Sequence, residues 1–304
     1  MTLGMMMSLT YIIGQLSAPI NDFISFIQSV QDAKISLERL NEIHSQPDED
    51  TDLDDKVTEL PEDRTIRVEH VTFSYDGAER NYALNDVSLE IPERKVTAIV
   101  GESGCGKTTL IKLLQVFYQP THGSIKVGNL PLTSINPHFW RRVTGSVMQE
   151  SFIFSDTFAH NIALDSDSLD ETRLYQAAKM ANIDGFIRTL PLGYHTKIGM
   201  EGNGVSQGQR QRLLIARAIY KNPEYIFFDE ATNALDTTNE SEIMHHLYEF
   251  YHGRTVVVAA HRLSTVKNAD QILVMRHGVI VECGTHQELL AKKGYYYELV
   301  KNQL

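Results

Sequence analysis

The 304-residue sequence predicts an α/β fold with a mainly parallel sheet, preceded by one long N-terminal helix. Three short runs, residues 96–100, 225–228 and 255–260, are almost wholly apolar and rich in β-branched or aromatic residues. Helical segments alternate with these runs, which indicates a parallel sheet covered by helices, because strands buried on both faces carry no polar side. A hydrophobic content of 42% is ordinary for a globular core.

The N-terminal segment, residues 1–21, contains no charged side chain. A helix of this length is roughly 30 Å long, about the thickness of the hydrocarbon core of a bilayer. Polar residues such as Ser8, Gln15 and Ser17 interrupt it. Two interpretations remain: a membrane helix whose polar side chains face other helices or a polar cavity, or a buried helix of a soluble domain. A signal peptide is not indicated, since a basic start and a small-residue cleavage site are lacking.

The apolar spacing continues through residues 23–43 between charged residues, so we expect the same helix to extend into water. Residues 46–63 then carry nine acidic residues and one lysine, which accounts for −8 of the formal charge of −11. We interpret this run as a solvated linker. The predicted organisation is therefore a helix over 1–45, an acidic linker over 46–63 and an α/β domain over 64–304. We expect further membrane helices to precede this chain.

Net charge argues against a nucleic-acid-binding protein, and cysteine content argues against a protein built on disulfides or a cysteine metal site. Outside the acidic run the charges nearly balance and form no basic face, so nucleic acid is not an expected partner. The two cysteines, Cys105 and Cys283, have neither metal-site nor disulfide spacing, which favours a reducing compartment.

A phosphate-binding loop occupies residues 101–109, whose sequence GESGCGKTT matches G-x-x-x-x-G-K-[ST]. It follows an apolar strand and opens a helix expected over 108–117, which is the context that the pattern requires. Backbone N–H groups and the helix N-terminus favour polyphosphate there. We expect Lys107 to contact the β- and γ-phosphates and Thr108 to ligate Mg²⁺. Cys105 stands at a permissive position, and its alkylation should obstruct nucleotide.

Two adjacent acids, Asp229 and Glu230, end the apolar run 225–228. An acid at the tip of a strand beside a phosphate loop can hold the Mg²⁺ shell, and we assign this task to Asp229. The second acid is placed to polarise an attacking water, so Glu230 is the expected general base.

Further motifs resemble those of ATP-binding cassette (ABC) proteins. Residues 205–212, VSQGQRQR, resemble the signature motif of that family. Tyr75 matches the aromatic residue that stacks on adenine, Gln149 the Q-loop glutamine, Asp236 the D-loop and His261 the switch histidine. These motifs follow the family order over 64–304. The resemblance implies a P-loop NTPase (RecA-like) core, an antiparallel β subdomain and an α-helical signature subdomain.

The resemblance also implies how the residues act. Two copies would pair head to tail, each ATP lying between one copy's phosphate loop and the other's signature. The implied catalytic residues are Glu230, His261, Gln149 and Lys107; the nucleotide-binding residues are Tyr75, Gly101, Glu102, Ser103, Gly104, Cys105, Gly106, Lys107, Thr108, Thr109, Ser206, Gly208, Gln209 and Asp236; the Mg²⁺ ligands are Thr108, Gln149 and Asp229.

Three positions depart from the family pattern. Val205 stands where leucine is usual. Gln207 stands where glycine is usual, and a left-handed conformation there would be costly for glutamine. Met200 replaces a glutamate in residues 197–202, which resemble the exporter coupling loop, so we expect the inter-domain contact to be shifted.

A membrane helix directly before the cassette is the arrangement of exporter half-transporters, which work as homodimers. The resemblance therefore implies a cell (inner) membrane protein with its cassette on the cytoplasmic side. Residues 17–41, 205–215 and 230–236 are most similar to bacterial peptidase-containing bacteriocin and peptide exporters, which carry a cysteine-protease domain upstream. A lipid or drug exporter is the alternative. A soluble cassette ATPase would lack the uncharged first span, and an inactive cassette would lack Glu230 or His261.

Overall fold

The computed structural model describes residues 2–44, 53, 55–77, 81–148, 151–164, 169–199, 204–229, 237–260 and 266–301. The chain forms two compact units, Met1–Asp54 and Asp55–Leu304. The last nine residues of the acidic run, 55–63, thus lie in the second unit rather than in a linker between units. Val57 explains why: it forms a parallel bridge with Ile135, and its N–H donates to the Ser134 carbonyl at 2.9 Å.

The first unit contains one helix, α1 (Leu3–His44), among its described residues. Residues Leu3–Glu42 are long and apolar enough to cross a membrane, with a mean hydropathy of 1.3 over the best window. Hydroxyl groups along it bond within the helix; Thr10 donates to the Met6 carbonyl and Ser17 to the Ile13 carbonyl. Such bonds satisfy polar side chains without water. The predicted continuation of the helix beyond residue 23 is confirmed.

The second unit is built on a six-stranded sheet of order β10-β9-β3-β8-β7-β6. Its strands are β3 (Val96–Val100), β6 (Thr144–Val147), β7 (Tyr225–Asp229), β8 (Thr255–Ala259), β9 (Gln271–Arg276) and β10 (Val279–Gly284). Neighbouring strands from β9 to β6 pair in parallel, and β10 is antiparallel to β9. The predicted mainly parallel sheet is confirmed.

A second sheet is antiparallel, with the order β2-β1-β4-β5. It comprises β1 (Ile66–Phe73), β2 (Leu84–Ile91), β4 (His122–Val127) and β5 (Leu130–Pro131). The buried side chains of β1 are Ile66, Val68, Val71 and Phe73, and they cover one face of this sheet. This is the antiparallel subdomain that the resemblance implied.

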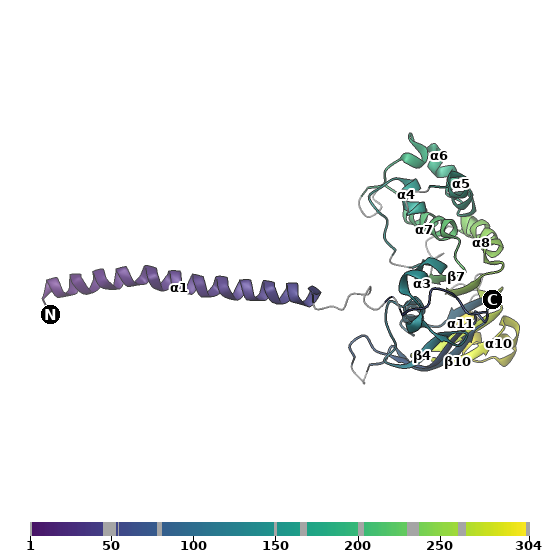
Figure 1. Cartoon of the computed structure of the whole chain (residues 1–304), viewed down its shortest axis with the longest axis horizontal. Coiled ribbons are helices and arrows are strands. Elements are labelled where there is room, and N and C mark those ends of the chain that lie inside the picture. The colour runs from purple at the N-terminus through teal and green to yellow at the C-terminus, as the bar shows by residue number, and fades with distance from the viewer. Residues whose placement is uncertain are drawn as a thin grey trace. The chain divides into compact units, whose positions relative to one another are not determined.

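The helices of the second unit are α2 (Lys107–Leu114), α3 (Pro137–Val143), α4 (Phe158–Ala163), α5 (Glu171–Met180), α6 (Asp184–Thr189), α7 (Gln207–Lys221), α8 (Thr237–Tyr251), α10 (His286–Lys292) and α11 (Tyr295–Val300), with 3₁₀ turns at Leu132–Ser134 and Gly193–His195. In Figure 1 the helices α4 to α7 gather at one end of this unit, away from β4 and β10. They form the expected helical subdomain. Helix α2 is shorter than predicted, because Val116 adopts a left-handed φ of 62°.

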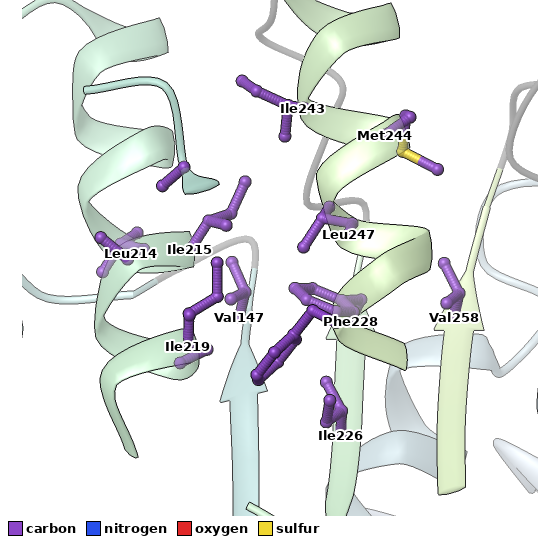
Figure 2. Close-up of a cluster of buried hydrophobic side chains, with 14 of the residues drawn as sticks. Val147, Leu214, Ile215, Ile219, Ile226, Phe228, Ile243, Met244, Leu247 and Val258 are labelled. Atoms are coloured by element: carbon purple, nitrogen blue, oxygen red, sulfur yellow. The ribbon is translucent and has the colours of Figure 1, made fainter. Parts of the chain in front are cut away.

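Two hydrophobic cores lie on opposite faces of the parallel sheet. Alternate residues of β7 enter different cores: Ile226 and Phe228 pack with helices α7 and α8, whereas Tyr225 and Phe227 pack with α2 and the antiparallel sheet. Figure 2 shows Ile226 and Phe228 pointing toward Ile219 and other side chains of the core that contains α7 and α8. Both faces of the sheet are covered, which explains the nearly continuous apolar runs of the central strands β3, β7 and β8 that the sequence indicated.

Candidate active site

The loop between β3 and α2 packs closely against the backbone of neighbouring segments. A Cβ atom at Gly101 would lie 2.3 Å from the Met275 carbonyl oxygen, and one at Gly106 would lie 2.8 Å from the Ala83 carbonyl oxygen. Gly106 also has a φ of 108°, which side-chain-bearing residues rarely adopt. The two glycines therefore allow a close approach, and the loop is a concave strip of backbone that opens α2.

Lys107, the first residue of α2, points back into this loop. Its side chain is buried, and its ammonium donates to the carbonyl oxygens of Gly101 at 2.9 Å and Glu102 at 3.0 Å. The Cys105 sulfur lies 3.8 Å from the same nitrogen. All three partners are neutral groups, so the positive charge is available to an anion placed in the loop. Cys105 is itself buried in the core beneath the loop.

Tyr75 stands beside the loop. Its hydroxyl lies 3.1 Å from the Thr109 hydroxyl of α2, and 51% of the residue's surface is exposed. Its ring meets Phe73 and Tyr118 edge-on, with centroids 5.0 and 5.3 Å away. An aromatic ring that neighbouring rings hold in place but that remains half exposed can stack on a base. Tyr118 was not predicted to lie here. The only signal for it in the sequence is that an aromatic residue follows the helix after the phosphate loop.

Asp229 is the last residue of β7 and is 1% exposed. It pairs with Ala259 of β8, which pairs in turn with Ile99 of β3. Asp229 therefore lies two strand spacings, roughly 10 Å, from the strand that leads into the phosphate loop. The structure brings both to the same carboxyl edge of the sheet, where open α/β sheets bind ligands.

Four predicted residues, Gln149, Glu230, Asp236 and His261, lie outside the described residues. In the sequence, three of them come just after strands of the parallel sheet. Glu230 directly follows β7, and Gln149 and His261 come two residues after β6 and β8. These parallel strands end at the edge where Asp229 lies. Met200 also lies outside the described residues.

The signature motif opens helix α7. Ser206 is the N-cap: its hydroxyl accepts from the Gln209 N–H at 3.2 Å, and its N–H donates to the Gln209 side chain at 2.8 Å. Ser206 is exposed and Gly208 lies in the first turn. The N-terminus of a 15-residue helix is suited to bind an anion.

The expected strain at Gln207 is wrong. Gln207 is the first helical residue of α7 and does not have a positive φ. The capping pair of Ser206 and Gln209 places position 207 in an ordinary helical conformation, which glutamine adopts readily.

The described part of the chain contains no hydrogen bond from Ser206, Gly208 or Gln209 to the loop 101–109. Tyr75 thus contacts the helix that follows the loop, and Asp229 lies at the same sheet edge as the loop, whereas the signature residues belong to the helical subdomain.

Comparisons with known proteins agree with this geometry. A family profile described as "ABC transporter" matches residues 84–233, which include the loop, Ser206 and Asp229. The exotoxin translocation ATP-binding protein PaxB of Pasteurella aerogenes is 41% identical over all of this chain and 42% of its own length. The alpha-hemolysin translocation ATP-binding protein HlyB of Escherichia coli O157:H7 is 40% identical over 98% of this chain and 42% of its own length.

Among solved structures, a bacterial Atm1-family ABC exporter with ATP bound superposes with a TM-score of 0.82 at 34% identity, over 90% of this chain and 48% of that one. The chain thus spans less than half the length of these relatives.

Proposed function

We propose that the chain contains the nucleotide-binding domain of an ABC transporter and that it hydrolyses Mg²⁺·ATP to drive export across a membrane. The observation that carries this proposal is that the Lys107 loop and the buried Asp229 lie at the same carboxyl edge of one sheet.

The residues present fit a nucleotide. The loop has a concave backbone that a Cβ at Gly101 or Gly106 would disrupt, and Lys107 offers its charge from inside the curve. Exposed Tyr75 provides a stacking surface next to Thr109. Adenine would therefore stack on Tyr75, and the phosphates would lie against the loop N–H groups and Lys107.

The donor set also fits Mg²⁺, which prefers carboxylate and hydroxyl oxygens. Asp229 supplies a buried carboxylate at the strand end and Thr108 a hydroxyl in the first turn of α2. With Gln149 they would hold the ion, which neutralises charge on the phosphates when bound. Glu230 would accept a proton from the attacking water, and His261 would orient that water and the γ-phosphate.

We infer that a second copy of this domain completes each site. Ser206 is exposed at the N-terminus of α7, and a helix N-terminus favours an anion. A partner's nucleotide would meet Ser206, Gly208 and Gln209 there, and Asp236 would lie at the seam. ATP would hold the two copies together, and its hydrolysis would release them.

We propose that α1 belongs to the membrane part of the exporter and that the nucleotide-binding domain is cytoplasmic. Its length and hydropathy support a span, and both cysteines are free, as a reducing compartment requires. The relatives are named as toxin translocation proteins. These names favour a polypeptide cargo of the protein-toxin class over the short peptides or bacteriocins expected from the sequence.

Phosphate release by the purified full chain in detergent tests the proposed activity. We expect Lys107→Ala to abolish ATP binding and turnover, because no other cation in the loop replaces it. Lys112→Ala is the matched control, since Lys112 lies in the last turn of the same helix α2. Equal losses in both variants, or full activity of Lys107→Ala, would contradict the proposal.

A further inference from the structure

Arg217 is a half-buried cation in the middle of the signature helix α7. Its guanidinium donates to three neutral acceptors: Nε to the Asn161 carbonyl at 2.7 Å, one terminal nitrogen to the Phe152 carbonyl at 2.9 Å, and the other to the Asn161 side-chain oxygen at 3.2 Å. It also lies over the Phe154 ring, 5.6 Å from its centroid. Burial lowers the pKa of Arg217 to about 10, so it stays charged at neutral pH.

Asn161, at 0% exposure, extends these contacts along the segment 152–157. Its side-chain oxygen accepts from the Phe154 N–H at 2.9 Å, and its amide nitrogen donates to the carbonyls of Phe154, Asp156 and Thr157. Asn161 lies in α4, so the Asn161 carbonyl that meets Arg217 belongs to the C-terminal end of that helix, where a positive charge is favoured. Arg217 and Asn161 thus form one polar clamp between α7 and the segment 152–157.

The clamp adds polar contacts to a segment whose Ile153 is buried in the core but whose two phenylalanines are partly exposed. Phe152 is 57% exposed and Phe154 48% exposed, and their rings meet edge-on at 5.2 Å. Since about half of each residue is exposed, the backbone bonds to Asn161 and Arg217 help to fix where the two rings lie. On the other side, Ser206 is eleven residues before Arg217 on the same helix, roughly 16 Å along its axis.

We propose that Arg217 is a positioning residue that makes the Ser206 end of α7 and the exposed rings of Phe152 and Phe154 one rigid body, so that closure of a nucleotide site on Ser206 displaces the aromatic pair. This inference rests on the proposed contact between Ser206 and the nucleotide of a second copy. Arginine suits the task because its planar fork reaches two residues with three bonds, whereas lysine offers a single point of contact.

A tryptophan reporter tests the displacement. In a Glu230→Gln background, chosen to retain ATP, Phe152→Trp places an exposed indole on the aromatic pair. The natural tryptophan, Trp140, is 1% exposed and shielded from a soluble quencher such as acrylamide. Quenching of the full chain in detergent, with and without Mg²⁺ and ATP, therefore follows position 152. ATP affinity, dimer formation and melting temperature are measured on the same samples.

We expect ATP to change the quenching in the parent reporter. In Arg217→Met this change should fall to less than about half, because all three bonds are lost, while ATP affinity stays within about twofold since the phosphate loop is untouched. Arg217→Lys should lie between the two and serves if Arg217→Met fails to fold. Arg173→Met is the matched control: Arg173 contacts Tyr220 of the same helix at 4.9 Å but lies on α5, outside the clamp.

A purely structural role predicts a different pattern, namely a lower melting temperature with an unchanged ATP response in the folded protein. That pattern in both Arg217 variants would overturn the inference. So would a parent chain that binds ATP and dimerises without any response at position 152. Failure of the parent to bind ATP at all would instead contradict the proposed function.

Discussion

Replacing Tyr75 separates base stacking from the other contacts of the nucleotide. Base stacking on an aromatic side chain is worth about 1–3 kcal/mol by alanine substitution, which corresponds to about a 5- to 150-fold weaker Kd. The Tyr75 residue is half exposed, and its ring makes T-shaped contacts with Phe73 and Tyr118, so its removal disturbs less packing than removal of a buried ring would. We therefore expect Tyr75→Ala to weaken ATP binding by this factor and to change kcat much less.

Tyr75→Phe isolates the hydroxyl. It keeps the ring but removes the bond to Thr109, a hydrogen bond worth about 0.5–1.5 kcal/mol. We expect a loss of less than about tenfold, smaller than that of Tyr75→Ala. Titration of the full chain in detergent with ATP by calorimetry measures both, alongside kcat from phosphate release.

Phe117→Ala is the control for this series, because Phe117 is an exposed aromatic residue outside the trio of Phe73, Tyr75 and Tyr118. Unchanged ATP affinity in Tyr75→Ala would refute adenine stacking. An equal loss in Tyr75→Phe would show that the hydroxyl, rather than the ring, carries the contact.

Three further predictions address the chemistry, the loop and the core. Glu230→Gln should bind ATP normally, release almost no phosphate and accumulate as an ATP-dependent dimer in size-exclusion chromatography; normal phosphate release would remove Glu230 from the role of general base. Alkylation of Cys105 in a Cys283→Ser chain should be slow, because Cys105 is 5% exposed, and should abolish ATP binding, whereas bound nucleotide should protect it; a fully labelled chain that still binds ATP would disprove this. Phe228→Ala should destabilise the second unit by about 3–5 kcal/mol, because Phe228 fills the core between β7, α7 and α8 (Figure 2), and thermal melting should show it as a fall of about 6–20 °C; a fall below about 2 °C would contradict this packing.

The sequence predicted best what depends on local pattern. The apolar strands, the phosphate loop and the helix that follows it are local in the chain, so spacing alone indicated Lys107 and Asp229. The structure adds that these residues lie at the same edge of the sheet, two strand spacings apart, because β8 lies between β3 and β7.

Long-range contacts were out of reach of that reasoning. Arg217 and Asn161 are far apart in the chain, and neither belongs to a pattern that predicts their bond. Tyr118 and Tyr75 are far apart in the sequence, and the fold brings their rings together. Likewise, the second unit begins at Asp55 because Val57 pairs with the distant Ile135. The prediction of strain at Gln207 failed for another reason. The family's glycine suggested a left-handed backbone, whereas the Ser206 cap places position 207 in the helix.

The central claim is that each ATP site combines the loop of one copy with the signature of another. Mixing two defective chains tests it most directly: Lys107→Ala lacks a working loop, and Ser206→Arg lacks a working signature, so neither chain alone should hydrolyse ATP. In a head-to-tail dimer of the two, one site carries both defects and the other carries none. We predict that an equal mixture recovers about a quarter of the parental activity, because about half of the dimers are mixed and each has one intact site of two. Activity in the mixture no greater than the sum of the separate chains, or full activity of Ser206→Arg alone, would contradict the claim.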